Sequence, residues 1–458
     1  MNAADRNFDC IVIGAGIAGA SVAAELSASQ SVLVLERESQ PGYHTTGRSA
    51  ALYTTAYGPP VIRALTRASG NFFNARPAGP DAPPLLHPRG AAFVARPDQM
   101  GSLAKLRAEL GDAVSDLTAD QLERMVPLLR PGYARAGLFD RTAADIDVHA
   151  LHQHYLRATR DNGGHIACDA GVLGLLRLAD RWRIETLHGT VSAPVVINAS
   201  GAWADEIAQL AGVAPLGLIP KRRTALIVPP PPALQPDTMP MVVDADESFY
   251  MKPDAGKLLI SPADETPSPP CDAQPDELDI AICVDRIERA FNLSVRRIES
   301  KWAGLRNFLP DGGPIAAYDG EVPGFFWLAG QGGYGIQSAA ALRVHCQCRH
   351  GLGQARFKRR HPGRVATPVK RIPHDDRIHK VALHPGVIEN GADRFCAQLP
   401  RLDTGQPPAP RRHRGSFRGD DIRTAHGRAP VPICSTHVCI IGRFGLCEAV
   451  NGHASIST

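Results

Sequence analysis

Hydrophobic and polar positions in the first forty residues follow the order strand, turn, helix, strand. An apolar run over 8–13 is typical of a buried strand, and the alanine-rich stretch over 17–28 predicts the helix that follows. The sequence GAGIAG (14–19) joins them, and a second apolar run over 32–35 ends at Glu36. This order predicts a βαβ unit with a glycine-rich turn.

The glycine-rich turn has the residue types that a dinucleotide site requires. Gly14 permits a tight turn, Gly16 lets a pyrophosphate approach the backbone, and Gly19 lets the helix pack closely on the strand. The helix N-terminus then presents amide donors to phosphate. Glu36 can accept hydrogen bonds from ribose hydroxyls. We therefore expect a bound dinucleotide, and this pattern alone leaves NAD and FAD open.

Apolar periodicity predicts alternating helices and strands over most of the remaining chain. Helices are expected over 61–74, 99–110, 119–126, 147–160 (with Asp147 as N-cap) and 276–291. Strands are expected over 194–198, 220–228, 241–253, 257–262 and 324–329, the last running into GQGGYG and a further helix. The expected fold class is α/β with an α+β part: a doubly wound, Rossmann-like domain interleaved with an antiparallel-sheet domain. We assign about 1–60, 147–215 and 306–342 to the first domain, and about 61–146 and 216–305 to the second.

Composition divides the chain at about residue 342. The 458 residues carry a net charge of +4, but Lys and Arg number 30 against 38 Asp and Glu over 1–342, and 20 against 8 over 343–458. The second segment also holds ten of the 17 His and six of the ten Cys. We find neither a signal-like segment nor an apolar run of membrane-spanning length, so we expect a cytoplasmic protein without an integral membrane segment.

A polar, glycine-punctuated loop over 40–51 can lie along a pyrophosphate and a flat ring. Eight segments, in order from about residue 8 to 342, together resemble the glycine/D-amino acid oxidase (DAO) family of FAD-dependent oxidoreductases, and within it the bacterial D-arginine dehydrogenase branch. They are IVIGAGIAGAS, LERESQPGYHTTGRSAALYTTAYG, ADIDVHALHQHYLRA, INASGAWAD, LIPKRRTALI, DESFYMKPDAGKLL, KWAGLRNFLPDGGP and GFFWLAGQGGYGIQ. The resemblance implies FAD as cofactor and an active site between the two domains.

The resemblance also implies a set of cofactor contacts. These are Gly14, Gly16, Ala18, Gly19, Glu36, Arg37, Thr45, Thr46, Gly47, Arg48, Ser49, Ala50, Ala51, Val172, Gly201, Gly332, Gly333, Tyr334, Gly335, Ile336 and Gln337. The group 332–337 would direct a helix N-terminus at the flavin pyrimidine, where its dipole stabilises negative charge on the reduced ring. Gly333 and Tyr334 are also expected to line the substrate pocket with backbone groups.

Arg223 and Arg306, in otherwise apolar strands, are candidates to bind a substrate carboxylate, because a guanidinium fork matches two carboxylate oxygens. Surface ion pairs are the alternative for both, and the resemblance favours substrate binding. Arg222 lies on the opposite face of its strand from Arg223, so only one of them should face the site. Tyr57 and Tyr250 match aromatic substrate contacts of the family, whereas the residue type alone favours core positions.

Two positions depart from the D-arginine dehydrogenase pattern. Leu52 stands where that branch has a histidine beside the substrate, and Ala91 stands where it has a glutamate suited to a cationic side chain. Because neither residue can pair with a guanidinium, we expect a D-amino acid substrate with a small or apolar side chain, and weak use of D-arginine.

The expected reaction is oxidative deamination. A hydride passes from Cα to flavin N5, and the imino acid hydrolyses to a 2-oxo acid and ammonia. The electron acceptor is a quinone, an electron carrier or oxygen. No nucleic acid, metal or nucleophilic cysteine is expected: His149, His152 and His154 are interpreted as solvated or packing residues, and Cys10 as inert. A secondary-amine (sarcosine- or proline-like) oxidase and a catalytically impaired flavin-binding remnant are the alternatives.

After Leu342 the apolar period is lost, and Arg, His, Cys and Pro become frequent. Such a composition predicts a disordered tail over 343–458. The abrupt change within a helix favours a segment translated out of frame. The alternatives are an anion-binding basic tail, or a metal site at Cys346, Cys348 and His350 or at Cys434, His437 and Cys439, although these spacings match no standard zinc pattern.

Overall fold

The computed structural model of the chain describes residues 6–75, 82–232 and 234–343. A six-stranded sheet, in the order β10-β3-β2-β14-β21-β20, carries the N-terminal βαβ unit; all neighbours are parallel except β20 and β21. Its strands are β2 (Cys10–Ile13), β3 (Val32–Leu35), β10 (His165–Ala167), β14 (Val195–Asn198), β20 (Ile315–Tyr318) and β21 (Phe325–Ala329). The central strands are apolar and buried along their whole length, as expected where both faces of a parallel sheet are covered.

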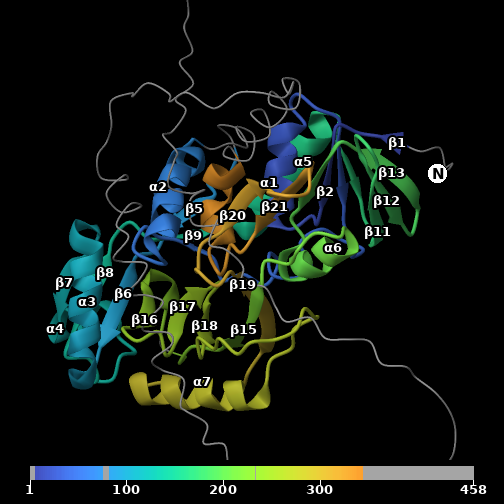
Figure 1. Cartoon of the computed structure of the whole chain (residues 1–458). Coiled ribbons are helices and arrows are strands. Elements are labelled where there is room, and N and C mark those ends of the chain that lie inside the picture. The colour runs from blue at the N-terminus through green and yellow to red at the C-terminus, as the bar shows by residue number, and fades with distance from the viewer. Residues whose placement is uncertain (1–5, 76–81, 233, 344–458) are drawn as a thin grey trace, which may run out of the picture. The chain divides into compact units, whose positions relative to one another are not determined.

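Helices α1 (Ile17–Leu26) and α5 (Val148–Asp161) pack against each other beside this sheet (Figure 1). Their apolar residues form one cluster, which includes Ala20, Leu151 and Tyr155. The predicted N-cap of α5 is confirmed, because the Asp147 carboxylate accepts a hydrogen bond from the Ala150 amide at 2.8 Å. The close packing of α5 on α1 places a second helix next to the glycine-rich turn.

An eight-stranded sheet forms the second layer, in the order β19-β15-β18-β17-β16-β6-β8-β7. Its strands are β6 (Ala91–Ala95), β7 (Ser115–Thr118), β8 (Ala136–Asp140), β15 (Ile219–Val228), β16 (Met241–Asp244), β17 (Tyr250–Asp254), β18 (Lys257–Ser261) and β19 (Ser300–Phe308). The sheet is antiparallel as predicted, except that β16 and β6 pair in parallel. Helix α7 (Glu277–Ala290) covers it, with Ile280, Cys283 and Ile287 in the core (Figure 1).

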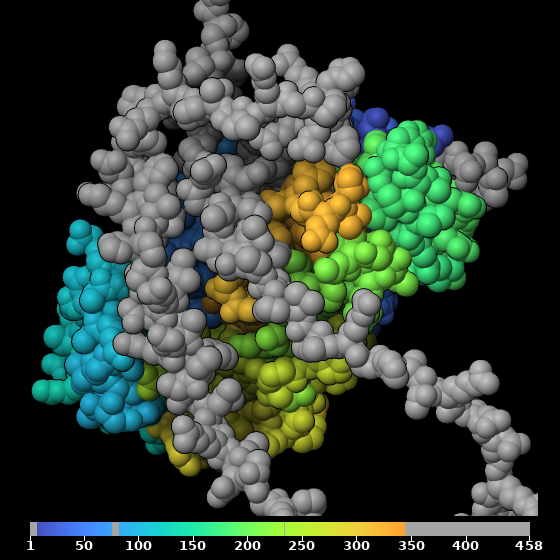
Figure 2. Space-filling view, in the orientation of Figure 1, coloured from blue at the N-terminus to red at the C-terminus, as the bar shows by residue number. Residues whose placement is uncertain are grey.

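Two smaller sheets complete the described part. One has the order β1-β13-β12-β11 and comprises β1 (Arg6–Asn7), β11 (Val172–Arg177), β12 (Trp182–Thr186) and β13 (Gly189–Ala193). The other has the order β4-β9-β5 and comprises β4 (Leu52–Tyr53), β5 (Leu86–Pro88) and β9 (Ala144–Ile146). The remaining helices are α2 (Pro60–Asn74), α3 (Met100–Leu110), α4 (Ala119–Met125), α6 (Ala204–Leu210) and a helix over 335–343. The four-stranded sheet (green) and the segment with α3 and α4 (cyan) lie at opposite sides of the described surface (Figure 2).

Two features of the structure bear on the segments that the sequence analysis assigned to the two domains. Phe73 of α2 and Leu85, both expected in the antiparallel-sheet domain, pack in the cluster that contains α1 and α5. The expected boundary at 305/306 falls inside β19, which continues in the eight-stranded sheet to Phe308. None of the described helices is both long enough and apolar enough to cross a membrane. The predictions for 343–458, including both candidate metal sites, lie outside the described residues apart from Arg343.

Candidate active site

The glycine-rich turn closes against two neighbouring backbone segments. Gly14 has a φ of +100°, and a Cβ there would lie 2.6 Å from the carbonyl oxygen of Ala199. A Cβ on Gly19 would lie 1.8 Å from the Gly14 carbonyl oxygen. Both positions therefore require glycine. The Glu36 carboxylate accepts a hydrogen bond from the Ala15 amide at 2.8 Å, so part of its capacity supports the turn itself.

His152 connects the turn to helix α5. Its Nε2 donates to the Ala15 carbonyl at 2.8 Å, and its ring lies close to Gly42. Burial lowers the pKa of His152, and the hydrogen bond to Ala15 opposes that shift without cancelling it. The neutral imidazole is thus the form that holds the turn. The sequence analysis interpreted His152 as a solvated or packing residue, and no local pattern signalled this long-range contact.

The loop over 43–49 connects the two layers. The Thr45 hydroxyl donates to the Leu305 carbonyl at 2.8 Å, and the Thr46 hydroxyl accepts from the Ile17 amide at 2.9 Å. Arg48, expected to contact the cofactor, uses its Nη1 to donate to the Ala303 carbonyl at 3.0 Å. This residue lines the cavity described below, but its guanidinium holds the loop on β19.

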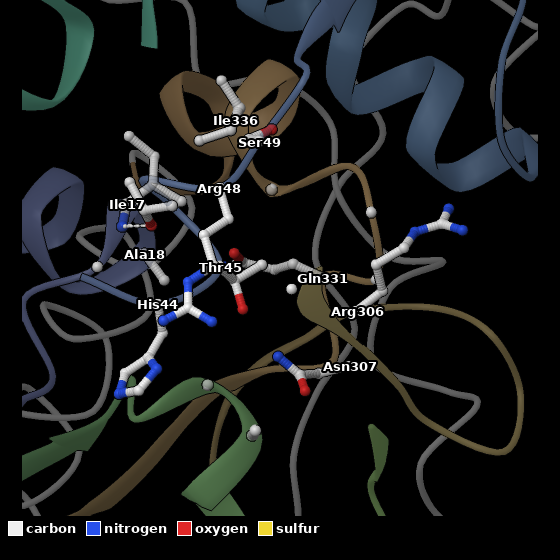
Figure 3. Close-up of a pocket in the computed structure, with 18 of the residues that line it drawn as sticks. Ile17, Ala18, His44, Thr45, Arg48, Ser49, Arg306, Asn307, Gln331 and Ile336 are labelled. Atoms are coloured by element: carbon white, nitrogen blue, oxygen red, sulfur yellow. Dashed lines mark hydrogen bonds between the residues drawn. The ribbon is translucent and has the colours of Figure 1, made fainter. Parts of the chain in front are cut away.

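A cavity of about 520 Å³ runs from the glycine-rich turn to the eight-stranded sheet. Of the predicted cofactor and substrate residues, Gly19, Gly47 and Tyr334 do not line it, and all others do. Ile17 and Ala18 lie at one side and Arg306 at the opposite side, with Thr45 and Gln331 between them (Figure 3). The cavity therefore has a dinucleotide end and an arginine end.

Several cavity-lining residues were missed by the sequence analysis. At the dinucleotide end, His44 lies 2.8 Å from the Glu38 carboxylate, its ring contacts Trp203, and the Arg37 guanidinium lies 4.3 Å from the Trp203 ring centroid. Trp203 lies far along the chain from the other three residues, so local spacing carries no signal of its association with them.

The cavity also contains polar atoms that lack a partner in the described residues. Arg223 Nε, Asn307 Oδ1, Gln331 Nε2 and Gln337 Nε2 are buried, unpaired and on the lining. Buried polar groups are nearly always hydrogen-bonded in folded proteins, so this set indicates a polar ligand. The donors and acceptors, the glycine-rich turn and the cavity volume fit a flavin dinucleotide.

The arginine end brings together the predicted substrate residues. Arg306 Nη2 donates to the Tyr57 hydroxyl at 3.3 Å, and the Tyr57 ring packs edge-on against Tyr334 with centroids 5.2 Å apart. Gly333 packs directly on the Arg306 guanidinium, where a Cβ would lie 2.1 Å from Nε. Burial raises the pKa of Tyr250, and the nearby Arg223 charge opposes the shift. The Tyr250 phenol therefore stays neutral and can donate.

The two faces of β15 separate the neighbouring arginines. Arg223 lines the cavity, whereas Arg222 turns away and pairs with Asp279 at 2.7 Å. Their alternation follows from the period of two in a strand. Arg223 and Arg306 share a partner, because both donate to the carboxylate of Glu265. The sequence analysis missed this residue.

A tight turn places Glu247, another missed residue, in the lining. Glu247 adopts a φ of +53°. The fully buried Asp244 carboxylate stabilises this turn by accepting hydrogen bonds from the Asp246 and Ser248 amides. Burial within the cavity raises the pKa of Glu247, and the charges of Arg306 and Arg223 counteract part of that shift.

Apolar side chains form a wall of the cavity, and Phe93, Met241 and Val243 of this wall share a core cluster with Tyr250. This wall consists of Leu52, Ala91, Phe93, Met241 and Val243. Both departures from the family pattern, Leu52 on β4 and Ala91 on β6, therefore face the cavity.

Comparisons with known proteins identify the family of the chain. The chain matches the model of the DAO family, FAD dependent oxidoreductase, over residues 9–342. A mitochondrial dimethylglycine dehydrogenase from Mus musculus is 28% identical over 147 residues, which are 31% of this chain and 17% of that protein. The chain thus spans less than a fifth of that relative's length.

Solved structures show the same fold. A glycine oxidase from Geobacillus kaustophilus has a TM-score of 0.65 at 20% identity, covering 76% of this chain and 95% of that one. An L-alpha-glycerophosphate oxidase from Mycoplasma pneumoniae, solved with FAD bound, has a TM-score of 0.68 at 17% identity, covering 75% and 94%. At these identities the likeness concerns the fold alone.

Proposed function

Because the chain belongs to the DAO family of FAD dependent oxidoreductases and its cofactor is FAD, we propose that it oxidatively deaminates D-amino acids with small or apolar side chains. The observation that carries this proposal is the arginine end of the cavity. Two guanidiniums, Arg223 and Arg306, and two phenols, Tyr57 and Tyr250, line it together with an apolar wall. The set matches a carboxylate, its hydrogen-bonding partners and a hydrocarbon side chain.

In this proposal each residue has a separate role. Arg306 and Arg223 bind the substrate carboxylate, and the neutral Tyr57 and Tyr250 hydroxyls hydrogen-bond it or close the pocket over it. Gly333 leaves space for the Arg306 guanidinium. The wall formed by Leu52, Ala91, Phe93, Met241 and Val243 receives the side chain and excludes water from it.

When bound, FAD would supply the two-electron acceptor for the hydride that leaves the substrate Cα. The protein's contribution is to bind the uncharged amine form with its Cα–H directed at the ring. The imino acid that results hydrolyses in water to a 2-oxo acid and ammonia. The motif resemblance supports the D-configuration. The relative named for dimethylglycine supports a second candidate, a secondary- or tertiary-amine oxidase of the same site.

An anaerobic reduction experiment tests the proposal. The purified holoprotein would be mixed with two matched pairs, D- and L-alanine and D- and L-leucine, and separately with D-arginine and with N-methylglycine. The flavin absorbance would be followed in each mixture. We expect rapid bleaching by D-alanine and D-leucine and none by the L-forms. Bleaching by D-arginine should be at least about tenfold slower, because a buried unpaired charge is costly.

The other outcomes contradict the proposal in distinct ways. Faster bleaching by N-methylglycine would favour the secondary-amine reaction. Bleaching by the L-forms would reverse the assigned configuration. A yellow protein that no amine bleaches would indicate a flavin-binding remnant.

A further inference from the structure

Glu265 lies between the two arginines that we assign to the substrate carboxylate. Its Oε1 accepts hydrogen bonds from Arg306 Nη1 at 2.9 Å and from Arg223 Nη2 at 3.1 Å. Its Oε2 accepts from Lys221 Nζ at 3.0 Å. One carboxylate therefore holds three cations from two adjacent strands, β15 and β19.

Glu265 approaches the arginines from outside the cavity. Its side chain is 41% exposed, whereas those of Arg223 and Arg306 are 12% and 8% exposed. Glu265 lines a separate surface groove with Asp279 and Arg286, and it is absent from the lining of the main cavity. The carboxylate thus contacts the guanidinium edges that face away from the proposed substrate.

Two buried guanidiniums this close together repel each other unless an anion is shared between them. Burial acts to raise the pKa of Glu265, but the hydrogen bond from Lys221 and the charges of Arg306 and Arg223 lower it overall. The carboxylate is therefore ionised at neutral pH. Lys221 lies on the same strand face as Arg223, two residues away, and fixes the oxygen that the arginines leave free.

We propose that Glu265 is a positioning residue, which holds Arg223 and Arg306 side by side so that their remaining N–H groups point into the cavity as one carboxylate-binding surface. The inference rests on the proposed function only for the identity of the substrate, because the surface would bind any small carboxylate. The proposal also gives Lys221 a supporting role, because its ammonium restrains the shared carboxylate of Glu265.

A second role for Glu265, in which it acts on the substrate only through its charge, predicts the opposite change in binding when Glu265 is removed. A nearby negative charge repels an incoming carboxylate, so its removal would strengthen binding if charge alone mattered. If Glu265 positions the arginines, its removal lets them separate and weakens binding. Glu265→Gln, which keeps the size and removes the charge, distinguishes these effects.

The experiment uses the full-length holoprotein and two ligands. Pyruvate binding would be measured from the change in flavin absorbance, and D-alanine by anaerobic stopped flow, which separates the dissociation constant from the limiting rate of flavin reduction. For Glu265→Gln we expect both dissociation constants to rise by at least about tenfold, since the two largely buried guanidiniums lose the anion that they share, while the limiting rate changes little.

A matched control is Glu277→Gln, since the Glu277 side chain is 81% exposed, pairs with Lys301 at 2.7 Å and, like Lys301, is absent from the cavity lining. This control should bind pyruvate like the wild type, and melting curves would verify that both variants fold. Unchanged or tighter pyruvate binding by Glu265→Gln overturns the inference, as does absence of pyruvate binding in the wild type. Weaker pyruvate binding without reduction by any amine supports it and refutes only the proposed function.

Discussion

The two ends of the cavity are built by different means. At the dinucleotide end, Gly14 and Gly19 act through close backbone packing: Gly19 packs on the Gly14 carbonyl, and Gly14 packs on the backbone of Ala199. At the arginine end, Arg306 meets Tyr57 across 249 positions of sequence and Glu265 across 41. The first end depends on the absence of side chains, whereas the second depends on long polar side chains held in place by one another. Substitutions should therefore affect the two ends in different ways.

Gly14→Ala is expected to have the largest effect. It adds a Cβ at φ +100° within 2.6 Å of the Ala199 carbonyl oxygen, and a residue forced into such backbone costs about 1–3 kcal/mol before any clash. We expect loss of most bound FAD, measured as the ratio of flavin to protein absorbance after purification. Flavin loss should be accompanied by a lower melting temperature.

Gly101→Ala is the matched control, because nothing lies within 4 Å of the Cβ that it adds within helix α3. That variant should retain its flavin and keep or slightly raise its stability, since alanine favours helix. Full flavin content in Gly14→Ala would contradict the assigned role of the turn.

Arg306→Lys should affect the arginine end without affecting the flavin. A lysine ammonium cannot reproduce the planar fork, and each hydrogen bond to a charged group contributes about 1.5–3 kcal/mol. We expect kcat/KM for D-alanine to fall by about 100-fold or more. The control Arg289→Lys should leave kcat/KM for D-alanine unchanged, because the Arg289 side chain is 75% exposed. Flavin loss in Arg306→Lys would show that the two ends are not separable.

His152→Gln should have the smallest effect, visible only in the pH dependence of stability. The folded state holds the pKa of His152 below its usual value of about 6.5, so the unfolded chain takes up the proton first. The contribution of the neutral histidine is complete above about pH 6.5 and is lost as the pH falls below that value.

The wild type should therefore lose about 1 kcal/mol more unfolding free energy between pH 7 and pH 5 than His152→Gln, which cannot titrate. Chemical denaturation at each pH measures this difference. His188→Gln, at an exposed turn residue, is the control and should follow the wild type. Parallel curves for the wild type and His152→Gln would contradict the assigned role of the neutral imidazole.

The same contrast explains what could be predicted from sequence. The βαβ unit, the Asp147 cap and the opposite orientations of Arg222 and Arg223 follow from patterns within a few residues, and the structure has all three. Periodicity also predicted α3 to within one residue at its start. Local spacing carries this information because helices and strands repeat every few positions.

Long-range polar contacts could not be predicted in this way. Glu265, Glu247 and His44 occupy loops or turns, where no period marks the direction of a side chain. The arginines beside Glu265 and Glu247, and the Trp203 ring that His44 contacts, are brought near only when the chain is folded. The parallel pairing of β16 with β6 was missed for the same reason, since strand patterns do not specify a distant neighbour.

The apolar wall and the two arginines proposed to bind the substrate carboxylate lie on different strands. This separation has an evolutionary consequence. Leu52 and Ala91 belong to β4 and β6, whereas the arginines belong to β15 and β19 and have their own counter-ion. Under the proposed function, a single substitution in the wall would alter which side chain is accepted and leave the binding of the substrate carboxylate unchanged. The proposal therefore implies that substrate preference could change stepwise, through intermediates that all still bind an amino acid.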